Sequence, residues 1–450
     1  MLWSALGGRP AGAAAPRFSG EGALPSAYRV TDLASASIAV AGAALAELVS
    51  LRTGAPPEVE VDRRLACGWF AGSLRPMGWR IPPVWHPTAG DYRTRDGWIR
   101  LHTNTAHHRQ VALAVLGTAP EREAIGQQVA TWSGEDLEQA IVERGGCAAR
   151  LRDRPAWDAH PQGRAVAAEP VVHLSVRGPG PAPAFSLPPE RPLRGVRVLD
   201  LTRVLAGPVA TRFLAGFGAE VLRIDPPWWE EPGVVPEMTL GKRCARLDLH
   251  QASDREQFMA LLEGCDVLVH GYRPDALARL GLGEDQRERI RPGLVDVSLD
   301  AYGWTGPWRT RRGFDSLVQM SSGIAAEGMR WAGRDAPVSL PVQALDHATG
   351  YLMAAAVLRG LVARCSTGAG WQARTSLART ARVLVEAGEA GAAEPPLAPE
   401  SEADLAEAVE HTGWGAARRL RPPLRMSGAP MAWEYPAGPL GTSPARWSSG

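Results

Sequence analysis

The sequence predicts an α/β protein with a doubly wound, Rossmann-like parallel sheet and a second, smaller α+β domain. After residue 193, short apolar strand patterns alternate with helical patterns, an order typical of a parallel sheet covered by helices on both faces. The chain has 450 residues, more than a single core usually organises, so a second domain or a large appendage is expected.

The sheet-forming half has clear element signals. We expect strands over 195–201, 220–225, 265–272 and 294–302, and a helix over 208–220. Pro208 suits the first turn of that helix and Gly218 its end, because proline lacks an amide hydrogen and glycine tolerates a left-handed stop. In sheets of this kind, ligands bind at the carboxyl ends of the strands.

The N-terminal region has a different pattern. A helix is expected from about Thr31 to Leu51, then a strand over 59–61, a loop-rich stretch over 69–98 and helices to about residue 150. Aligned without gaps, residues 32–54 and 346–368 share five of 23 positions, including an aspartate at the start and Thr-Gly at the end. This likeness hints at a duplication.

Composition predicts the boundaries between these regions. Residues 178–192 are rich in proline and glycine, which is typical of a linker. Residues 386–402 are acidic and rich in Ala, Gly and Pro, with little to bury. The predicted organisation is therefore a first region over 1–177, the linker, a ligand-binding half over 193–385, and a flexible connection with a C-terminal tail over 386–450.

Overall composition narrows the function classes. A net charge of +1 gives no global field for nucleic acid or anionic lipid, so small molecules or proteins are the expected partners. The five cysteines form no CxxC pair, which favours a reducing cytoplasm and no metal centre. The apolar runs near 38–49 and 352–363 are short and carry Glu47 and Arg359, so we expect neither export nor membrane insertion.

Several common catalytic motifs are absent from the sequence. The loop after the first strand lacks the GxGxxG of dinucleotide sites, and there is no GxSxG, HExxH or Walker sequence. His107 and His108, with His102 nearby, have no acidic or cysteine neighbours at ligand spacing, which favours a surface or supporting role over metal binding.

Asp346 is the candidate nucleophile. It stands at the start of a long apolar, helix-like run within residues 341–380. Aspartate is also a preferred helix N-cap, so position alone favours a capping role. Its neighbours in the sequence decide between the two interpretations.

Several segments together resemble the class III CoA-transferase family, which includes formyl-CoA transferases and carnitine CoA-transferases. The resemblance rests on RVLDLTRVLAGPVATRFLAGFGAEVLRID (197–225), GKRCARLDL (241–249), DVLVHGYRPDALARLGLG (266–283), VSLDAYGWTGPWRTRRGFDSLVQMSSG (297–323) and the motif around Asp346. Residues 91–104 and 143–172 resemble later parts of the same family pattern. The two halves of the pattern thus stand in reversed order, as after a fusion or a permutation.

The resemblance implies an enzyme that moves CoA from an acyl-CoA to a carboxylic acid. Asp346 would attack the thioester and then carry CoA as an aspartyl thioester, in steps of covalent catalysis. With an ordinary pKa of about 3.9, it would be ionised at neutral pH and would need no auxiliary base. CoA would be a substrate, no prosthetic group is implied, and a homodimer is the family's usual assembly. The CoA-contacting positions by resemblance are Val204, Leu205, Lys242, Arg243, Gly271, Tyr272, Arg273, Arg279 and Tyr302.

Lys242 and Asp300 affect the expected binding of CoA in opposite ways. Lys242 is the only lysine in the chain, and it falls where the resemblance places CoA phosphates. Asp300 stands where some family members have lysine, which removes one polar CoA contact.

Two other functions stay open. Acyl-CoA racemases of the same fold need a histidine in a GHD-like motif, and here the motif reads GFD with Phe314, which cannot exchange a proton. A non-catalytic CoA-binding or regulatory protein is the third option, because the halves are rearranged. In the first region Asp32 is expected to be a structural cap. The acyl group and the acceptor are not specified by the sequence.

Overall fold

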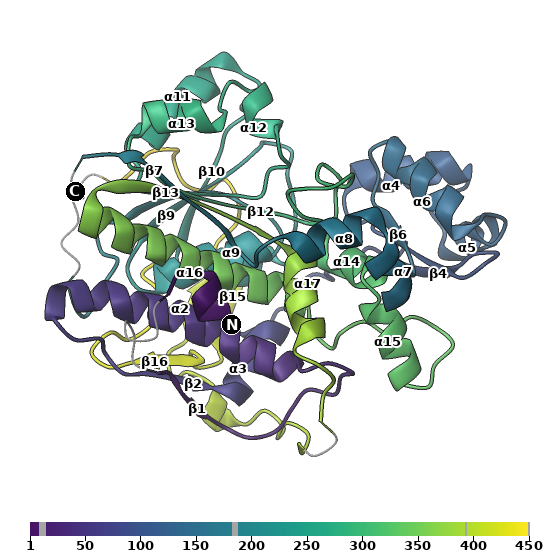
Figure 1. Cartoon of the computed structure of the whole chain (residues 1–450), viewed down its shortest axis with the longest axis horizontal. Helices are drawn as coiled ribbons and strands as arrows, with labels where there is room; N and C mark the ends of the chain where they lie inside the picture. Colours follow the sequence, from purple (N-terminus) through teal and green to yellow (C-terminus); the bar gives the residue numbers. More distant parts are fainter. Residues whose placement is uncertain (9–14, 182–187, 392–393, 449–450) are drawn as a thin grey trace.

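The computed structural model describes residues 1–8, 15–181, 188–391 and 394–448, and its centre is a seven-stranded sheet (Figure 1). The strand order is β10-β9-β8-β11-β12-β13-β7, and every neighbouring pair is parallel except β13 with β7. The strands are β7 (His173–Pro179), β8 (Arg197–Leu201), β9 (Glu220–Asp225), β10 (Lys242–Arg246), β11 (Val267–His270), β12 (Val295–Asp300) and β13 (Ala369–Ser376). The predicted α/β class with a mostly parallel sheet is confirmed.

Both faces of this sheet are buried, because successive strand residues alternate between two cores. Val198 and Val267 point into the larger core, whereas Leu199 and Leu268 point into the smaller one. A strand that is buried on both faces reads as a continuous apolar run, and this is why β8, β9, β11 and β12 were predictable. The predicted strand over 220–225 coincides with β9.

Helices cover the two faces of the sheet. Helices α9 (Ala206–Gly216) and α16 (Ala344–Thr367) pack on the larger core, and α11 (Ala252–Glu263) packs on the smaller one. Pro208 lies in the first turn of α9, and Gly218 has a positive φ of 104° just after its end, as expected. The connections from β9, β11 and β12 carry α10 (Val235–Met238), α12 (Ala276–Arg279), α13 (Glu284–Ile290), α14 (Asp315–Ser321) and α15 (Ile324–Trp331), and α17 (Leu377–Glu386) follows β13.

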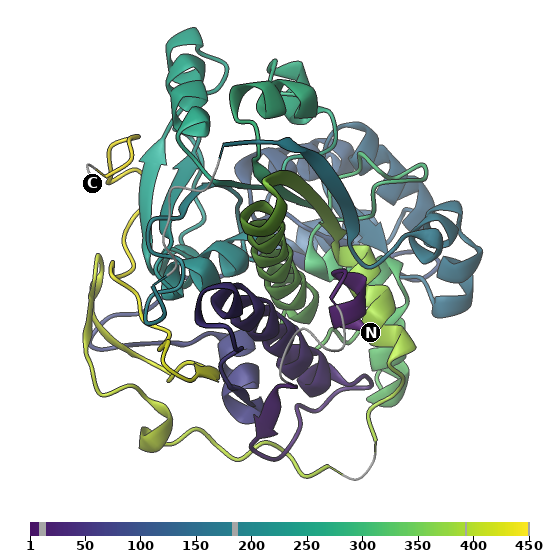
Figure 2. The same ribbon diagram turned by 60° about the vertical axis from the view of Figure 1, so that its left-hand side comes forward.

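Helix α2 (Val30–Thr53) forms a further layer by packing along the outer side of α16 (Figure 2). Both helices have 24 residues, carry aspartate as their third residue, and end at a glycine in the left-handed conformation. Helix α2 is long and apolar enough by composition to cross a membrane, but 83% of its most apolar window is buried inside the protein. The apolar sequence of α2 is therefore that expected of a core helix.

A smaller lobe stands beside the main body (Figure 1). It has a three-stranded antiparallel sheet of β4 (Gly90–Arg93), β5 (Trp98–Leu101) and β6 (Ala148–Arg150). Its core is formed with α4 (Ala106–Leu116), α5 (Arg122–Val129) and α6 (Gly134–Glu143), and α7 (Arg154–Ala159) and α8 (Pro161–Ala168) lead back to the main body. The expected smaller α+β unit is present, but it occupies only the later part of residues 1–177.

The predicted boundaries need two corrections. Strand β7, which reaches Pro179, joins the edge of the main sheet, so the first region is not a separate domain and the linker begins inside a strand. Part of that linker, 182–187, lies outside the described residues. The segment 386–450 is also more than a tail, because three of its strands complete two small sheets of the main body.

Each of these two small sheets combines strands from the first 80 residues with strands from the C-terminal segment. Their strands are β1 (Arg17–Ser19), β2 (Val59–Asp62) and β16 (Leu424–Met426) in one, and β3 (Leu74–Pro76), β14 (Glu410–Thr412) and β15 (Gly415–Arg419) in the other. The remaining described elements are α1 (Leu2–Ala5), α3 (Arg63–Ala71) and the short 3-10 helix Glu402–Asp404. Strands β15 and β16 escaped prediction because they are short, carry arginines, and pair with strands more than 300 residues away. Strand β14 has only three residues and pairs with β15.

Candidate active site

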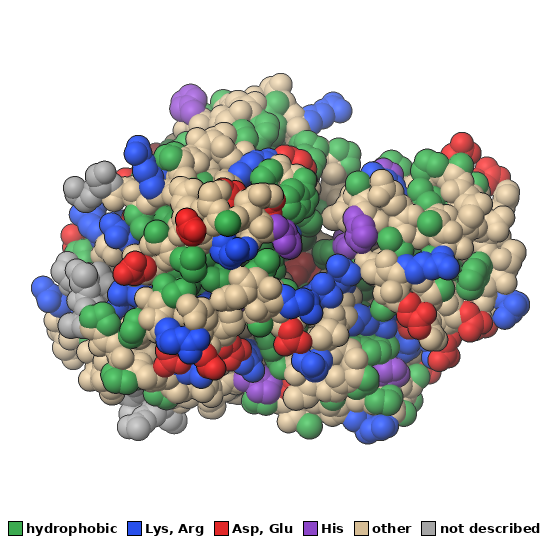
Figure 3. Space-filling model, turned by 90° about the horizontal axis from the view of Figure 1, so that it is seen from above, with side chains coloured by type: hydrophobic (Ala, Val, Ile, Leu, Met, Phe, Trp, Pro, Cys, Tyr) green, Lys and Arg blue, Asp and Glu red, His purple; other side chains and the backbone are tan. Residues whose placement is uncertain are grey.

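A cavity of about 620 Å³ lies at the carboxyl ends of the central strands. Its walls come from the loops after β8, β11 and β12, from the N-terminal ends of α16 and α17, and from His108 of the small lobe. Figure 3 shows the molecule hollowed between the main body and the small lobe, with basic and histidine side chains gathered around the hollow. This is the edge at which a doubly wound sheet binds its ligands.

Asp346 lines this cavity, and the structure corrects its expected role as a helix cap. Helix α16 begins at Ala344 after Gln343, so Asp346 is the third residue of the helix. The cap is supplied by Asp315, whose Oδ2 accepts hydrogen bonds from the amides of Leu345 at 2.9 Å and Asp346 at 3.0 Å. Because Asp315 satisfies these amides, the Asp346 carboxyl is free for chemistry. Within the described residues, no group donates a hydrogen bond to it.

The surroundings of Asp346 also shift the pKa of its carboxyl group. Burial is the main cause that raises its pKa well above the ordinary value, and the nearby Asp315 carboxylate raises it further. Burial likewise raises the pKa of Asp315, although the two amides and Gln319 oppose this. The pKa of Asp346 is therefore not the ordinary value on which the expected ionisation at neutral pH was based. The two carboxyls therefore favour retention of a proton more than an isolated aspartate does.

The wall that faces the strand ends is basic. Arg273, Arg279 and Arg312 line the cavity, and within the described part of the chain no carboxylate pairs with any of them. Burial and the neighbouring guanidinium groups of Arg312 and Arg279 lower the pKa of Arg273. Arg311 also lines the cavity, but it pairs with Glu138 of the small lobe at 3.0 Å. Uncompensated positive charge in a concave site attracts anionic ligands.

The structure brings together most of the residues predicted from the sequence. Val204, Gly271, Tyr272, Arg273 and Arg279 all line the cavity. Leu205 and Tyr302 do not line it. Leu205 is buried in the larger core, and Tyr302 is fully covered, with its hydroxyl 3.1 Å from that of Ser321. These two side chains lie behind the wall of the cavity.

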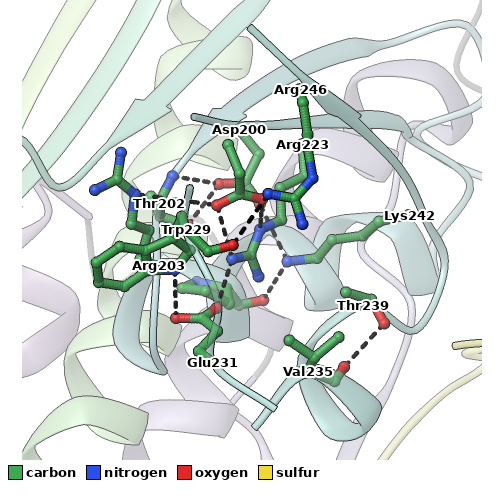
Figure 4. Close-up of polar contacts among 12 residues, drawn as sticks. Asp200, Thr202, Arg203, Arg223, Trp229, Glu231, Val235, Thr239, Lys242 and Arg246 are labelled. Atoms are coloured by element: carbon green, nitrogen blue, oxygen red, sulfur yellow. Dashed lines mark hydrogen bonds and ion pairs between the residues drawn. The ribbon is translucent and has the colours of Figure 1, made fainter. Parts of the chain in front are cut away.

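The predicted contact of Lys242 with CoA phosphates does not fit its position (Figure 4). Its Nζ atom is completely buried, 3.1 Å from Asp200 and 3.0 Å from the carbonyl oxygen of Pro208. Asp200 also accepts hydrogen bonds from Thr202 and Thr211, so this ion pair fastens the end of β8 to the start of α9. The sole lysine stabilises the loop that lines the cavity, and its charge is already neutralised.

Arg243 is also placed away from the cavity. It pairs with Glu220 at 3.0 Å, at the beginning of β9, whereas the cavity lies beyond the carboxyl ends of the strands. The order of residues along the chain does not reveal where a side chain points on a strand, and for this reason the predicted CoA contacts of Lys242 and Arg243 differ from their positions.

Phe314 lines the cavity at the position discussed for a racemase histidine, and two histidines of the small lobe lie on it. His102 stacks on its ring with a centroid distance of 3.6 Å, and His108 meets it edge-on at 5.9 Å. Burial, with the charge of Arg312, lowers the pKa of His108 to about 4, so its imidazole is neutral at physiological pH. The expectation of a supporting role for these histidines fits His102, whereas His108 reaches the cavity itself.

Other lining residues were missed in the sequence. Arg309, Arg311 and Arg312 form a run of three arginines in four positions, just before the GFD motif, and this run was a usable signal. Trp229 gave no signal, because it stands in a loop whose position depends on contacts distant in sequence. Asp300 also lines the cavity. Its Oδ1 accepts from the amide of Gly303 at 2.8 Å, and burial raises its pKa well above the ordinary range.

The first region of the chain holds the loop that follows β12. Buried Gln162 donates to the carbonyl oxygens of Tyr302 at 2.8 Å and Thr305 at 2.9 Å, and accepts from the amide of Trp308 at 2.6 Å. Glu169 accepts from the amide of Thr305 at 2.7 Å. The loop then runs into the arginines and Phe314 of the cavity wall. The two halves of the chain therefore build this cavity together.

The structure shows no metal centre in the part of the chain that it describes, since no three His, Cys, Asp or Glu side chains converge there. Asp32, the counterpart of Asp346 in α2, lies on the surface, 2.7 Å from Arg63. It is the third residue of its helix and makes no capping bond, so the predicted cap role is corrected to a surface ion pair.

A doubly wound sheet with a buried carboxyl and a basic cavity at its strand ends is suited to an anionic ligand. Residues 193–403 match the model of CoA-transferase family III. The reversed order of the two halves of the family pattern stays a prediction.

Curated relatives agree with this assignment. The chain is 29% identical over 324 residues to an acyl-CoA transferase of Gibberella moniliformis, covering 66% of this chain and 56% of that protein. It is 35% identical over 195 residues to the succinyl-CoA:glutarate CoA-transferase of Mus musculus, covering 40% and 44%. The chain thus spans about half the length of these relatives. A crystal structure of a Mycobacterium tuberculosis protein is 29% identical and covers 44% of this chain and 59% of that one, with a TM-score of 0.40.

Proposed function

We propose that the chain transfers CoA from an acyl-CoA to a carboxylic acid, with Asp346 as the covalent carrier. The observation that carries the proposal is the Asp346 carboxyl, which lines a basic cavity at the strand ends and accepts no hydrogen bond from a described residue. Because Asp315 caps α16, both carboxyl oxygens of Asp346 are available for reaction. The family of residues 193–403 and the names of the relatives support transfer of CoA in general.

The proposed steps conserve atoms and charge. Ionised Asp346 attacks the thioester carbonyl carbon, the C–S bond breaks, and the CoA thiolate leaves with the electron pair. The thiolate then attacks the Asp346 carboxyl carbon of the mixed anhydride, and the donor acid departs as a carboxylate. An acceptor carboxylate repeats the two exchanges in reverse, which restores Asp346 and gives the new acyl-CoA. Splitting the transfer in this way is covalent catalysis.

The arrangement of the cavity fits the demands of these steps. The 3′-phosphate and pyrophosphate of CoA need positive charge, which Arg273, Arg279 and Arg312 supply without carboxylate partners in the described chain. Both intermediates hydrolyse easily, so the burial of Asp346 protects them from water. The same burial raises the pKa of Asp346, so protection is obtained at the expense of nucleophile ionisation.

Trapping of the intermediate tests the proposal. The protein is incubated with a panel of acyl-CoA donors, treated with hydroxylamine, and digested for peptide mass spectrometry. We expect the hydroxamate on Asp346 and an unmodified Asp32 peptide, which serves as the internal control. If CoA binds but Asp346 stays unmodified with every donor, the chain is a CoA-binding regulatory protein and the transferase proposal is wrong.

A second candidate, acyl-CoA racemisation, is favoured by one observation. His108 lines the cavity together with Asp346, so an imidazole is present although Phe314 replaces the motif histidine. Its neutral ring suits it as a proton acceptor. Incorporation of deuterium from heavy water at the α-carbon of a bound 2-methylacyl-CoA, lost in H108Q, would support this function. No incorporation is expected for the transferase.

A further inference from the structure

Val204 has an unusual backbone conformation for a valine. Its φ of +65° lies in the left-handed region, and among the described non-glycine residues only Asp275 shares a positive φ. A β-branched side chain is disfavoured there, because its Cβ substituents crowd the neighbouring carbonyl oxygen. Such residues persist where the surroundings hold them, and they gather at functional sites. Val204 lies between β8 and α9 and lines the cavity.

Glu231 is the group that holds this conformation (Figure 4). Its Oε2 accepts a hydrogen bond from the amide of Val204 at 2.9 Å and another from Nε1 of Trp229 at 3.0 Å. Its other oxygen binds Arg223, a fully buried arginine of β9 that also pairs with Asp225 at 2.8 Å. The Glu231 side chain is only 8% exposed, so its position is fixed from three directions.

The same turn sets the side chain that precedes it. The guanidinium of Arg203 lies over the ring of Trp229 at 4.6 Å and over that of Tyr272 at 5.5 Å. It also donates a hydrogen bond to the Tyr272 hydroxyl at 3.2 Å. Arg203, Trp229 and Tyr272 all line the cavity. Glu231 therefore binds, directly or through Val204, two of the three loops that make this part of the wall.

We propose that Glu231 is a positioning residue that holds Val204 in its left-handed conformation and so shapes the wall formed by Arg203, Trp229 and Tyr272 for ligand binding. A glycine at 204 would adopt the same conformation without a side-chain penalty. The need for Glu231 should therefore disappear when residue 204 is glycine. The proposal rests on the proposed function only for the identity of the ligand, which is taken to be CoA.

The test compares E231A, V204G and the double variant E231A/V204G for CoA binding by calorimetry and for thermal unfolding. We expect E231A to weaken CoA binding on the order of tenfold or more, as for other strained sites that lose their support. The double variant should recover most of that loss and melt at a higher temperature than E231A. E230A is the matched control, because the exposed Glu230 carboxylate pairs with Arg246 and makes no hydrogen bond to Val204 or Trp229 in the described chain. It should bind CoA like the wild type.

Each other outcome is decisive. Wild-type CoA binding by folded E231A would overturn the proposal, as would an equal loss in E231A and E231A/V204G, since the Arg223 ion pair would then account for the effect. If E231A does not fold, folding of the double variant supports the proposal and its failure overturns it. If the wild type binds no CoA, the proposed function fails, and the recovery of thermal stability by V204G in the E231A background still decides the role of Glu231.

Discussion

Asp315 and Asp346 share one helix N-terminus, and their two roles depend on different protonation. Asp315 accepts two amide hydrogen bonds, which favour its charged form, whereas Asp346 receives none from the described residues. When Asp315 is charged, its field disfavours a second charge on Asp346. The raised pKa thus favours the protonated form of Asp346, the carboxyl that we propose as the nucleophile.

The first prediction concerns pH at this pair. The ionised form of Asp346 attacks, so thioester formation should rise with pH through its raised pKa. Replacing Asp315 by asparagine keeps an oxygen for the two amides but removes the neighbouring charge, so the pKa of Asp346 falls and the rise moves to lower pH. Rates of Asp346 trapping between about pH 4 and pH 9 measure this shift.

Stability supplies the control for this prediction. A carboxyl with a raised folded-state pKa stabilises the protein at low pH, and this contribution is lost as pH rises from the ordinary carboxyl range through the raised value. D346N should therefore unfold at the wild-type temperature at about pH 4 and at a higher temperature near pH 8. Equal melting of the two proteins at both values would contradict the raised pKa.

Lys242 gives a second residue-scale prediction. K242M leaves Asp200 buried without its cation, which should cost about 3 kcal/mol of unfolding free energy, measured by denaturant titration. The dependence of CoA affinity on salt should stay unchanged, because this charge does not reach the cavity. R273M is the matched comparison and should flatten that dependence with little loss of stability. A flattened salt dependence in K242M would restore the phosphate-binding role predicted from the sequence.

At the scale of elements, α8 and the loop 302–308 act as one unit. Gln162 uses both its donor and its acceptor on this loop, and Gly306 allows the close approach, since a Cβ there would lie 2.6 Å from the Gln162 side chain. The loop leads into the arginines of the wall but not into Asp346. Disturbing the contact should therefore affect ligand binding more than the chemical steps.

The third prediction uses this separation. Q162A removes three hydrogen bonds and should cost about 1–3 kcal/mol of stability, with a rise in KM for the acyl-CoA that exceeds the fall in kcat. At neutral pH Q162E should behave like Q162A, because its carboxylate would face two carbonyl oxygens without a proton to donate. At lower pH the carboxyl becomes protonated and can donate a hydrogen bond again, so Q162E should recover activity. Q128A, on the exposed face of α5, is the control. A fall in kcat alone, without pH-dependent recovery, would contradict the predicted role.

The sequence predicted the elements whose signals are local. Strands β8 and β9 are buried on both faces, and Pro208 and Gly218 mark the turns around α9, so a short window sufficed. Strand β16 pairs with β2, which lies more than 360 residues earlier in the sequence, and no local pattern encodes such a distant partner.

The candidate site shows the same limit. Asp346 and Gly271–Arg273 stand at strand or helix ends that the sequence order locates. Glu231 and His108 act through contacts between distant loops, so only the folded chain reveals them. The direction of Lys242 into the core and the capping of α16 by Asp315 depend on packing in the same way.

At the scale of the whole molecule, a buried charge cluster attaches the C-terminal segment to helices α9 and α10. Arg419 of β15 pairs with Glu237 at 3.2 Å, and Glu237 also pairs with Arg212 of α9. Burial opposes the charge, but Arg419 and Arg212 prevail and lower the pKa of Glu237 to about 2. Stability from this cluster is present above the ordinary carboxyl range and is lost as pH falls from about 4.5 towards 2.

The fourth prediction tests this attachment. R419A should reduce the unfolding free energy by about 3 kcal/mol at neutral pH, because it leaves part of the Glu237 charge uncompensated in the interior. R418A, which removes a surface pair with Glu402, should change it by about 0.5 kcal/mol or less. Denaturant unfolding at neutral pH measures both. Equal effects of the two substitutions would mean that 386–450 behaves as the loose tail expected from its composition.

The joint construction of the cavity has a kinetic consequence. His108 lines the cavity, and Gln162 and Glu169 hold the loop that leads into its wall, all on the polypeptide that carries Asp346. The two halves therefore meet at an effective concentration of roughly millimolar or higher, whatever the concentration of the protein. Assembly of this cavity is a first-order event. The specific activity of the protein should therefore stay constant on dilution to nanomolar concentration. A site shared between separate chains that bind each other with micromolar affinity would dissociate at that concentration.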